Sequence, residues 1–290
     1  MGDLFDIGKA GISAYKNALA TTGQNIANVD TEGYNRRDTK IEELSSSSAD
    51  ILSISHSSGL GVRMGEITRA FDQFLDIKLQ SSTSSYSFAK SKSEIFDQLE
   101  STLIPKSATV GTRLREFFDG LSNLAQDPDN ANLRRLALSG ANAVSASISE
   151  LHHGLTDLRT VTHGTLELTV ADFNSTLKNL SHVQNEILGN SVKSGAPHGL
   201  LDRRDTLLEQ LSEIADISVD YQANGGVTVS LGNLGAVGTL LEGATFNEVT
   251  VQSDMSGVKT FIKDNFGVSS GVHFSSGQMA CLLYTSPSPR

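Results

Sequence analysis

The chain has 290 residues, a formal net charge of −10 and one cysteine, Cys281, which cannot by itself form an internal disulfide. An acidic chain without a run of lysines and arginines lacks the concentrated basic face that nucleic-acid binding requires, so no nucleic-acid partner is expected. No apolar run approaches the roughly 20 residues that cross a bilayer, so membrane insertion is not expected either.

A cleavable secretion signal is not expected at the N-terminus. Asp3 and Asp6 stand where a signal peptide has its basic region, and no apolar core follows them. Composition alone therefore suggests a cytoplasmic protein. With no tryptophan and only 6% aromatic residues, the chain can build only thin aliphatic cores, which favour long helices over a compact globule.

An amphipathic helix is predicted at the N-terminus. Its apolar residues recur at spacings of three, four and seven, which places them in one stripe along the helix. Such a stripe has no partner in its own segment and has to find one elsewhere, so we take it as a candidate subunit interface. The candidate interface residues are Leu4, Ile7, Ile12, Tyr15, Leu19 and Ile26, and Phe5 belongs to the same stripe.

A turn is predicted after this helix. The short polar side chains of Asn25, Asn28 and Asp30 favour helix ends, and Gly33 supplies a position where the chain can reverse. The segment from Gln24 to Arg36 resembles the N-terminal signature of the bacterial flagellar axial proteins, the family of rod, hook and hook-associated proteins, which usually has Asn-Asn at the first two positions. The apolar pattern alone fits an ordinary capped helix equally well, whereas the whole signature favours the family. The signature residues are Asn25, Ile26, Ala27, Asn28, Thr31, Gly33, Tyr34 and Arg36.

Residues 37–68 are predicted to form a polar, extended connector. Alternating stretches at 51–54 and 61–64 suggest small extended pieces. The segments 59–62 and 67–69 again resemble the axial family, in which a Gly-Val segment leads into a long helix. The segment 59–62 is a weak match to a phosphate-binding loop, because it lacks a third glycine and a following lysine.

A long helix is predicted from about residue 69 to 103, and Pro105 ends it. Serine is a poor helix former, so we expect fraying or a break between Ser81 and Ser87. A second helix is predicted over 109–126. The buried face of the first helix is marked by Phe71, Phe74, Leu75, Leu79, Phe88, Ile95 and Leu99.

Asp127 followed by Pro128 is typical of a helix start, and the helix that begins there is predicted to reach residue 160 or beyond. Residues 166–187 then carry a sustained alternation of four and three, which predicts one helix packed along a seam. A coiled coil and a plain helix bundle both fit this pattern. The seam residues are Leu166, Val170, Phe173, Leu177, Leu180 and Ile187, with Gln184 at one polar position. A loop is expected at 189–199.

A run of four charged residues comes next: Asp202, Arg203, Arg204 and Asp205. They could form a catalytic cluster, but such a run is more often the solvated or ion-paired start of a helix, and we favour that structural interpretation. The segment 200–212 is followed by Ile-x-Val and a Gly-Gly turn, and this arrangement resembles the hook-associated members of the axial family.

The apolar spacing changes from helical to alternating after Ile214. The stretches 217–221 and 227–231 flank Asn224-Gly225-Gly226, which predicts a β-hairpin. Further short strands are expected at 239–241, 249–252 and 260–263.

Residues 281–290 do not fit the rest of the chain. They hold the only cysteine and two of the five prolines, and most of this stretch looks like translated sequencing-adapter read-through. We therefore expect 281–290 to be a non-native tail outside the fold. The resemblance implies that the native protein continues with long helices that return to pack on the N-terminal ones.

The predicted fold is mainly α: an elongated helical bundle or coiled-coil-like rod with an inserted β-rich domain that begins near residue 216. The predicted domains are an assembly helix with the signature at 1–36, the connector at 37–68, a long-helix bundle at 69–215, the start of the β-rich domain at 216–280, and the tail.

No catalytic, cofactor-binding or metal-binding site is predicted, and we do not expect an enzyme. His153 and His163 lie ten residues apart with no carboxylate or thiolate arranged around them. The sequence has no His-Glu-x-x-His, Cys-x-x-Cys or Gly-x-Ser-x-Gly motif.

The resemblance implies a structural subunit of the bacterial flagellum that joins hook to filament and assembles by helix packing between subunits. The implied partners are copies of itself in a ring, the flagellar hook protein, the next hook-associated protein, and the flagellar export apparatus with its chaperone. Export through the flagellar channel needs no cleaved signal, so the implied location is extracellular. Two alternatives stay open: another axial protein of the hook or distal rod, and a soluble coiled-coil adaptor in the cytoplasm.

Overall fold

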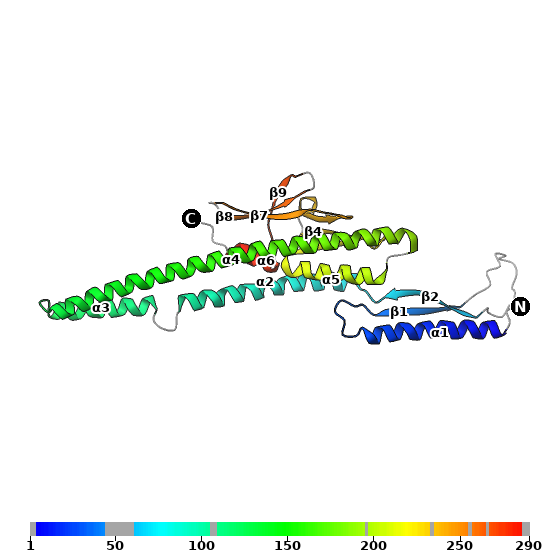
Figure 1. The fold of residues 1–290 in the computed structure, drawn as a ribbon, viewed down its shortest axis with the longest axis horizontal. Coiled ribbons are helices and arrows are strands. Elements are labelled where there is room, and N and C mark those ends of the chain that lie inside the picture. Colours follow the sequence, from blue (N-terminus) through cyan, green and yellow to red (C-terminus); the bar gives the residue numbers. More distant parts are fainter. Residues whose placement is uncertain are drawn as a thin grey trace.

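The computed structural model describes residues 4–43, 61–104, 109–194, 197–232, 235–254, 257–264 and 267–285. The molecule is elongated: long helices form a rod, a helix with a two-stranded sheet lies at one end, and two further small sheets lie toward one side (Figure 1). The predicted architecture, mainly α and elongated with a β-rich part from about residue 216, is confirmed.

The N-terminal unit consists of helix α1 (Leu4–Ala27) and the antiparallel strands β1 (Arg37–Glu43) and β2 (Val62–Arg69). Helix α1 runs alongside the hairpin, as Figure 1 shows. Gly61 has a φ of +98°, and a Cβ added to it would lie 3.4 Å from the Cα of Ile7, so the chain approaches the helix closely where β2 begins. The helix and the extended stretch at 61–64 were predicted, whereas the predicted pieces at 51–54 lie outside the described residues.

Helix α2 (Gln73–Leu103) begins at Asp72, whose carboxylate accepts hydrogen bonds from the backbone N–H groups of Phe74 (3.0 Å) and Leu75 (3.2 Å). The helix is continuous from Ser81 to Ser87, so the predicted break is wrong. Ser84 is buried on the line where α2 packs against other helices, α5 and α6 among them. Small side chains permit such close packing, and the packing outweighs the poor helix propensity of serine.

The buried face of α2 also differs from the prediction. Phe74, Leu75 and Leu79 are exposed, whereas Phe88 and Ile95 pack against the core as predicted. The buried and partly buried residues of α2 lie on a different face of the helix, and those near its N-terminus are polar. This face includes Gln80, Ser84, Phe88, Ser91 and Ile95.

Helix α3 (Val110–Gln126) and the first part of helix α4 (Ala131–Ser194) form an antiparallel hairpin at the far end of the rod (Figure 1). The predicted start of α4 at Asp127 is three or four residues too early. Asp127 and Pro128 lie in the turn, and the side chain of Asn130 caps the helix by accepting from the N–H groups of Asn132 (3.0 Å) and Leu133 (3.4 Å).

Helix α4 has 64 residues and is therefore about 96 Å long. It passes through Gly189 to Ser194, and helix α5 (His198–Ile214) begins within the predicted loop, so the bounds of 189–199 for that loop are too wide. The predicted seam is confirmed, because every seam residue from Leu166 to Ile187 is buried. It packs into a mixed core of α5, the first sheet and α6, rather than against a second helix of equal length.

The polar position of the seam has a structural role. Gln184 is fully buried and donates a hydrogen bond of 3.2 Å to the carbonyl of Val227 in the first sheet. Asn174 holds the second sheet in the same way, since it donates to the carbonyl of Val249 (2.8 Å) and accepts from its N–H (2.9 Å). Polar side chains of α4 therefore fix both sheets to the rod.

The first sheet has four antiparallel strands in the order β3-β4-β5-β6, and the second has three in the order β7-β8-β9. The predicted hairpin is confirmed, with Gly225 at a φ of +81° in its turn. The predicted strands at 239–241, 249–252 and 260–263 are confirmed, whereas β6 and β9 were not predicted. The bounds are β3 Ile217–Tyr221, β4 Val227–Leu231, β5 Thr239–Glu242, β6 Thr245–Phe246, β7 Glu248–Asp254, β8 Gly257–Lys263 and β9 Ser269–Val272, with a 3-10 turn at Gly235–Gly238.

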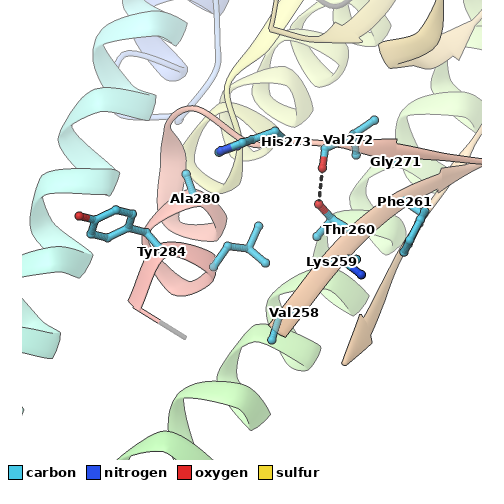
Figure 2. Close-up of a pocket in the computed structure, with 10 residues that line it drawn as sticks. Val258, Lys259, Thr260, Phe261, Gly271, Val272, His273, Ala280 and Tyr284 are labelled. Atoms are coloured by element: carbon cyan, nitrogen blue, oxygen red, sulfur yellow. Dashed lines mark hydrogen bonds between the residues drawn. The ribbon is translucent and has the colours of Figure 1, made fainter. Parts of the chain in front are cut away.

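Helix α6 (Gly277–Thr285) enters the core, which the sequence analysis did not predict. Cys281 and Leu282 are 1% and 4% exposed, so residues of this stretch pack in the core, whereas the expectation that 281–290 is a non-native tail stays a prediction. Between α6 and the β7–β9 sheet lies a cleft of about 540 Å³ (Figure 2). One of its walls is held by a hydrogen bond of 2.7 Å from Thr260 to the carbonyl of Val272, which ties β8 to β9.

Candidate assembly surface

Helix α1 presents an unpaired row of large apolar side chains. Phe5, Ile12, Leu19 and Ile26 recur every seven residues, Tyr15 follows Ile12 by three, and Val29 follows Ile26 by three in the turn just after α1. Their relative exposures are 67–76%, although each is large and apolar. A heptad repeat of this kind is the pattern by which one helix packs along another. We call these six residues the α1 stripe.

The opposite face of α1 covers the hairpin. Ala14 and Thr21 are its buried residues, and Ile7 is half-buried beside Gly61. At about 100° per residue, Ile7 lies on the other side of the helix from Phe5. The structure thus divides the six predicted interface residues between two faces: Leu4, Ile12, Tyr15, Leu19 and Ile26 are exposed, and Ile7 faces inward.

Val29 was missed by the sequence analysis, and Phe5 was placed on the stripe without being taken as an interface residue. The strict spacing of seven from Phe5 to Ile26 is the signal that identifies Phe5, and Val29 repeats the three-residue step from Ile12 to Tyr15. Burying a large apolar side chain contributes about 1.5–3 kcal/mol, so five of them along α1 and a sixth in the turn after it provide a substantial free energy for binding a partner helix. Contiguous exposed apolar surface of this kind marks interaction sites.

The signature residue Asn25 forms the joint between α1 and β1. Its side-chain oxygen accepts from the hydroxyl of Tyr34 (2.8 Å) and the N–H of Arg37 (3.0 Å), and its amide donates to the carbonyl of Arg37 (2.8 Å). All of the side chain's bonds therefore fix the start of the strand against the end of the helix. Asn25 is a structural residue of the unit that carries the stripe.

The other signature residues complete the turn. Asn28 donates to the carbonyl of Gln24 (2.9 Å), and Thr31 donates to Asn28 (3.2 Å). Gly33 has a φ of +75°, and a Cβ added to it would lie 2.1 Å from the hydroxyl of Thr206 on α5, so glycine is required there. Ile26 is the signature residue that lies on the α1 stripe, with Ala27 exposed beside it, and Arg36 forms an exposed ion pair with Asp38.

The charged run at the start of α5 is buried rather than solvated. Arg69 lies 3.0 Å from Asp202 and 2.6 Å from Asp205, while Arg204 lies 2.7 Å from Asp205. The ion-paired interpretation is confirmed, but the estimate for exposed pairs does not apply, because Arg69 and Arg204 leave only 6% and 4% of their side chains exposed. Arg203 alone in the run is exposed.

Burial governs the titration of this region. It raises the pKa of Asp205, and the positive charges of Arg204 and Arg69 act in the opposite direction. Burial also raises the pKa of the Tyr221 hydroxyl. This hydroxyl donates a hydrogen bond to Asp76, and that carboxylate raises the pKa further. Every charged group of the run that is buried is thus engaged with a partner inside the protein.

Within the described ranges, no group of three or more histidine, cysteine, aspartate or glutamate side chains could hold a metal ion. The same residues include no helix that is both long and apolar enough to span a membrane. The feature that the geometry singles out is therefore the α1 stripe, on a unit that is fixed to the rod through buried charges.

The family comparison matches more than half of the chain. Residues 96–286 match the model of the flagellar hook-associated protein FlgK helical domain, and residues 5–35 match that of the flagella basal body rod protein. The chain belongs to the flagellar hook-associated protein FlgK family. The resemblance to the axial proteins, and its narrowing to hook-associated members, is confirmed, and the rod-protein match covers α1 and most of the signature.

Curated relatives and a solved structure support the same family assignment. The chain is 28% identical over 250 residues to flagellar hook-associated protein 1 of Bacillus subtilis, covering 81% of this chain and 49% of that protein. It is 25% identical over 251 residues to the protein of the same name from Salmonella typhimurium, covering 86% and 44%. The flagellar hook junction protein FlgK from Burkholderia pseudomallei has the same fold, with a TM-score of 0.64, 21% identity, and coverage of 71% of this chain and 38% of that one. The chain spans about half the length of the curated relatives it matches.

Proposed function

We propose that this chain is a structural subunit of the bacterial flagellum that joins hook to filament, and that it assembles by packing α1 against helices of neighbouring subunits. The observation that carries the proposal is the α1 stripe, a heptad row left exposed on a helix whose other face is already covered. Because the chain belongs to the hook-associated family, the flagellum is the assembly in which this helix would find its partners.

The proposed partners are copies of the same protein in a ring, the flagellar hook protein and the next hook-associated protein. Before assembly the chain would be handled by the flagellar export apparatus and its chaperone. Its final location would then be outside the cell, reached through the flagellar channel without a cleaved signal. The proposed role needs no catalytic residue and no cofactor.

The stability of α1 suits this route. An isolated helix is marginal in water, and most helical stability in proteins comes from packing. The buried residues of α1, Ala14 and Thr21, are small and Ile7 is half-buried, so the helix can unfold for passage through a narrow channel and regain order when the α1 stripe is buried. Burial of the α1 stripe at the assembly site would thereby offset the free-energy cost of ordering the helix.

Two other functions would use the same stripe. The rod-protein match at residues 5–35, taken by itself, would also fit an axial protein of the hook or distal rod, and a heptad stripe by itself would suit a coiled-coil adaptor in the cytoplasm. Gold-labelled antibodies on sheared, purified flagella separate these readings. The proposal predicts label in a narrow zone between hook and filament. Label along the hook or rod would favour the other axial proteins, and protein confined to the cell lysate would favour the adaptor.

A further inference from the structure

The N-terminal unit is joined to the rod by a very short stretch of chain. Strand β2 ends at Arg69 and α2 begins at Gln73, so residues 70–72 form the whole covalent connection. A three-residue connection does not by itself fix the angle between two parts of a molecule. The contacts around this joint therefore decide how α1 is oriented relative to the rod.

Five side chains form a closed ring at the joint. Arg69 lies 2.6 Å from Asp205, and Asp205 lies 2.7 Å from Arg204. The guanidinium of Arg204 lies 5.0 Å from the centre of the Tyr221 ring, and the rings of Tyr221 and Phe71 are 5.5 Å apart. The guanidinium of Arg69 lies 4.6 Å from the centre of the Phe71 ring, which closes the circuit.

The ring joins the N-terminal unit and the connection to two elements of the rod. Arg69 belongs to β2, Phe71 to the connection itself, Asp205 and Arg204 to α5, and Tyr221 to β3. Because each member contacts the next, the N-terminal unit cannot rotate about the connection without separating Arg69 from Asp205 or from Phe71. The ring therefore couples the orientation of the unit to the fixed core of the rod.

Further polar contacts surround the ring. Asn35 donates to Asp202 (3.2 Å), which also pairs with Arg69 (3.0 Å), and a ring nitrogen of His198 lies 2.9 Å from the carbonyl oxygen of Ile67. His198, Asp202 and Asp205 are spaced by four and three, so one polar face of α5 meets the N-terminal unit. The other face of α5 supplies leucines to the core.

Polar contacts of this kind specify geometry more than they supply adhesion. Apolar contact is non-directional, whereas an ion pair with hydrogen-bonding geometry has a preferred direction. A buried charge that leaves its partner is left uncompensated at low dielectric, so other orientations of the unit are strongly disfavoured. The side chains of Arg69 and Asp205 are only 6% and 9% exposed, so this cost of separating buried charges applies to the ring.

We propose that the ring of Arg69, Asp205, Arg204, Tyr221 and Phe71 is an orientation lock that sets the angle at which α1 is presented relative to the rod. Its usefulness in assembly rests on the proposed function, whereas the lock itself is a property of the free chain. Opening the ring should leave both parts folded and free the angle between them.

Distances between spin labels test this proposal on the whole chain. In a Cys281→Ser background, labels at Lys16→Cys on α1 and Glu186→Cys on α4 report the angle, because both positions are exposed. Labels at Glu150→Cys and Glu186→Cys report α4 alone. With the ring intact, both pairs should give narrow distance distributions. Arg69→Met, which removes the guanidinium and its charge but keeps an unbranched apolar side chain, should broaden the first distribution and leave the second unchanged.

Arg63→Met is the matched control. Arg63 lies in the same strand and pairs with Glu42 at 3.1 Å, but its side chain is 63% exposed. This variant should leave the first distribution narrow. Phe71→Leu supplies a second opening of the ring that strands no charge, and it should broaden the same distribution if Arg69→Met fails to fold by circular dichroism. A narrow first distribution in either folded ring variant, or equal broadening by Arg63→Met, would overturn the lock. Hook–filament assembly plays no part in these measurements.

Discussion

At the scale of single residues, Asn25 shows that a residue of the family signature has a structural role. Its amide is occupied by three hydrogen bonds to Tyr34 and to the backbone of Arg37. Sequence reasoning placed Asn25 at a helix end correctly, because short polar side chains favour such positions. It could not identify the partners, since the donor and acceptor groups lie up to twelve residues away and are brought together only by the turn.

Replacing Asn25 with alanine is predicted to loosen this joint. The N–H and carbonyl of Arg37 would lose their partner, and an unsatisfied, partly buried polar group costs about 1–3 kcal/mol. Hydrogen exchange at the amide of Arg37 should accelerate accordingly. The control is Asn190→Ala, because the amide of Asn190 makes an exposed bond within α4 to the carbonyl of Glu186. Unchanged exchange at Arg37 in the Asn25 variant would show that the joint does not depend on this side chain.

Tyr221 is predicted to make stability depend on alkaline pH. Its folded-state pKa is raised above the ordinary value of 10.0, first by burial and then by Asp76. The folded protein therefore keeps the proton that the unfolded chain releases, so this contribution to stability is complete below pH 10 and declines as pH rises above it. The decline should be smaller in Tyr221→Phe, measured by urea unfolding of both proteins from pH 8 to 11. Parallel curves for the two proteins would contradict the raised pKa.

At the scale of elements, periodicity identified the α4 seam but not the burial of α2. The seam from Leu166 to Ile187 was readable because large apolar residues alternate in steps of four and three. The buried line of α2 contains Gln80, Ser84 and Ser91, which resemble a solvent-exposed face in sequence. The packing of α5 and α6 selects that line, and nothing within α2 itself encodes it. The same limit applies to the buried charges of α5, which look like surface residues until Arg69 is placed beside them.

The seam gives a prediction with a neighbouring control. Leu177 is fully buried in the mixed core, while the next residue, Lys178, is exposed. Leu177→Asp would place a carboxylate without a partner in an apolar site and should cost more than about 3 kcal/mol of unfolding free energy. Lys178→Ala should change it by less than about 0.5 kcal/mol. Thermal melts that show equal losses for the two variants would contradict the seam.

At the scale of the whole molecule, the elongated helical architecture and the change to β structure near residue 216 could be predicted from changes in apolar period. The small strands β6 and β9 could not, because two to four residues carry too little periodicity to be distinguished from turns. An apolar surface on α1 was predicted, but the division of the predicted interface residues between two faces of α1 depended on knowing where the hairpin lies. If the proposals hold, α1 is the assembly helix and the lock sets its angle to the rod, at one end of which it lies (Figure 1).

The most direct test of this account replaces two residues of the α1 stripe in the protein expressed from its own gene. Ile12→Asp with Leu19→Asp puts charges in the heptad seam while leaving the face of α1 that covers the hairpin unchanged. Ser13→Asp with Ala20→Asp is the control, since these neighbouring exposed positions have the same spacing but lie outside the stripe.

Electron microscopy of the cells gives the decisive measurement. The account predicts hooks without filaments and filament subunits released into the medium for the stripe variant, with normal filaments for the control. The purified stripe variant should keep strongly helical circular dichroism, because the rod does not depend on the stripe. Normal filaments and swimming in cells that carry only the stripe variant would contradict the claim that this surface assembles the subunit.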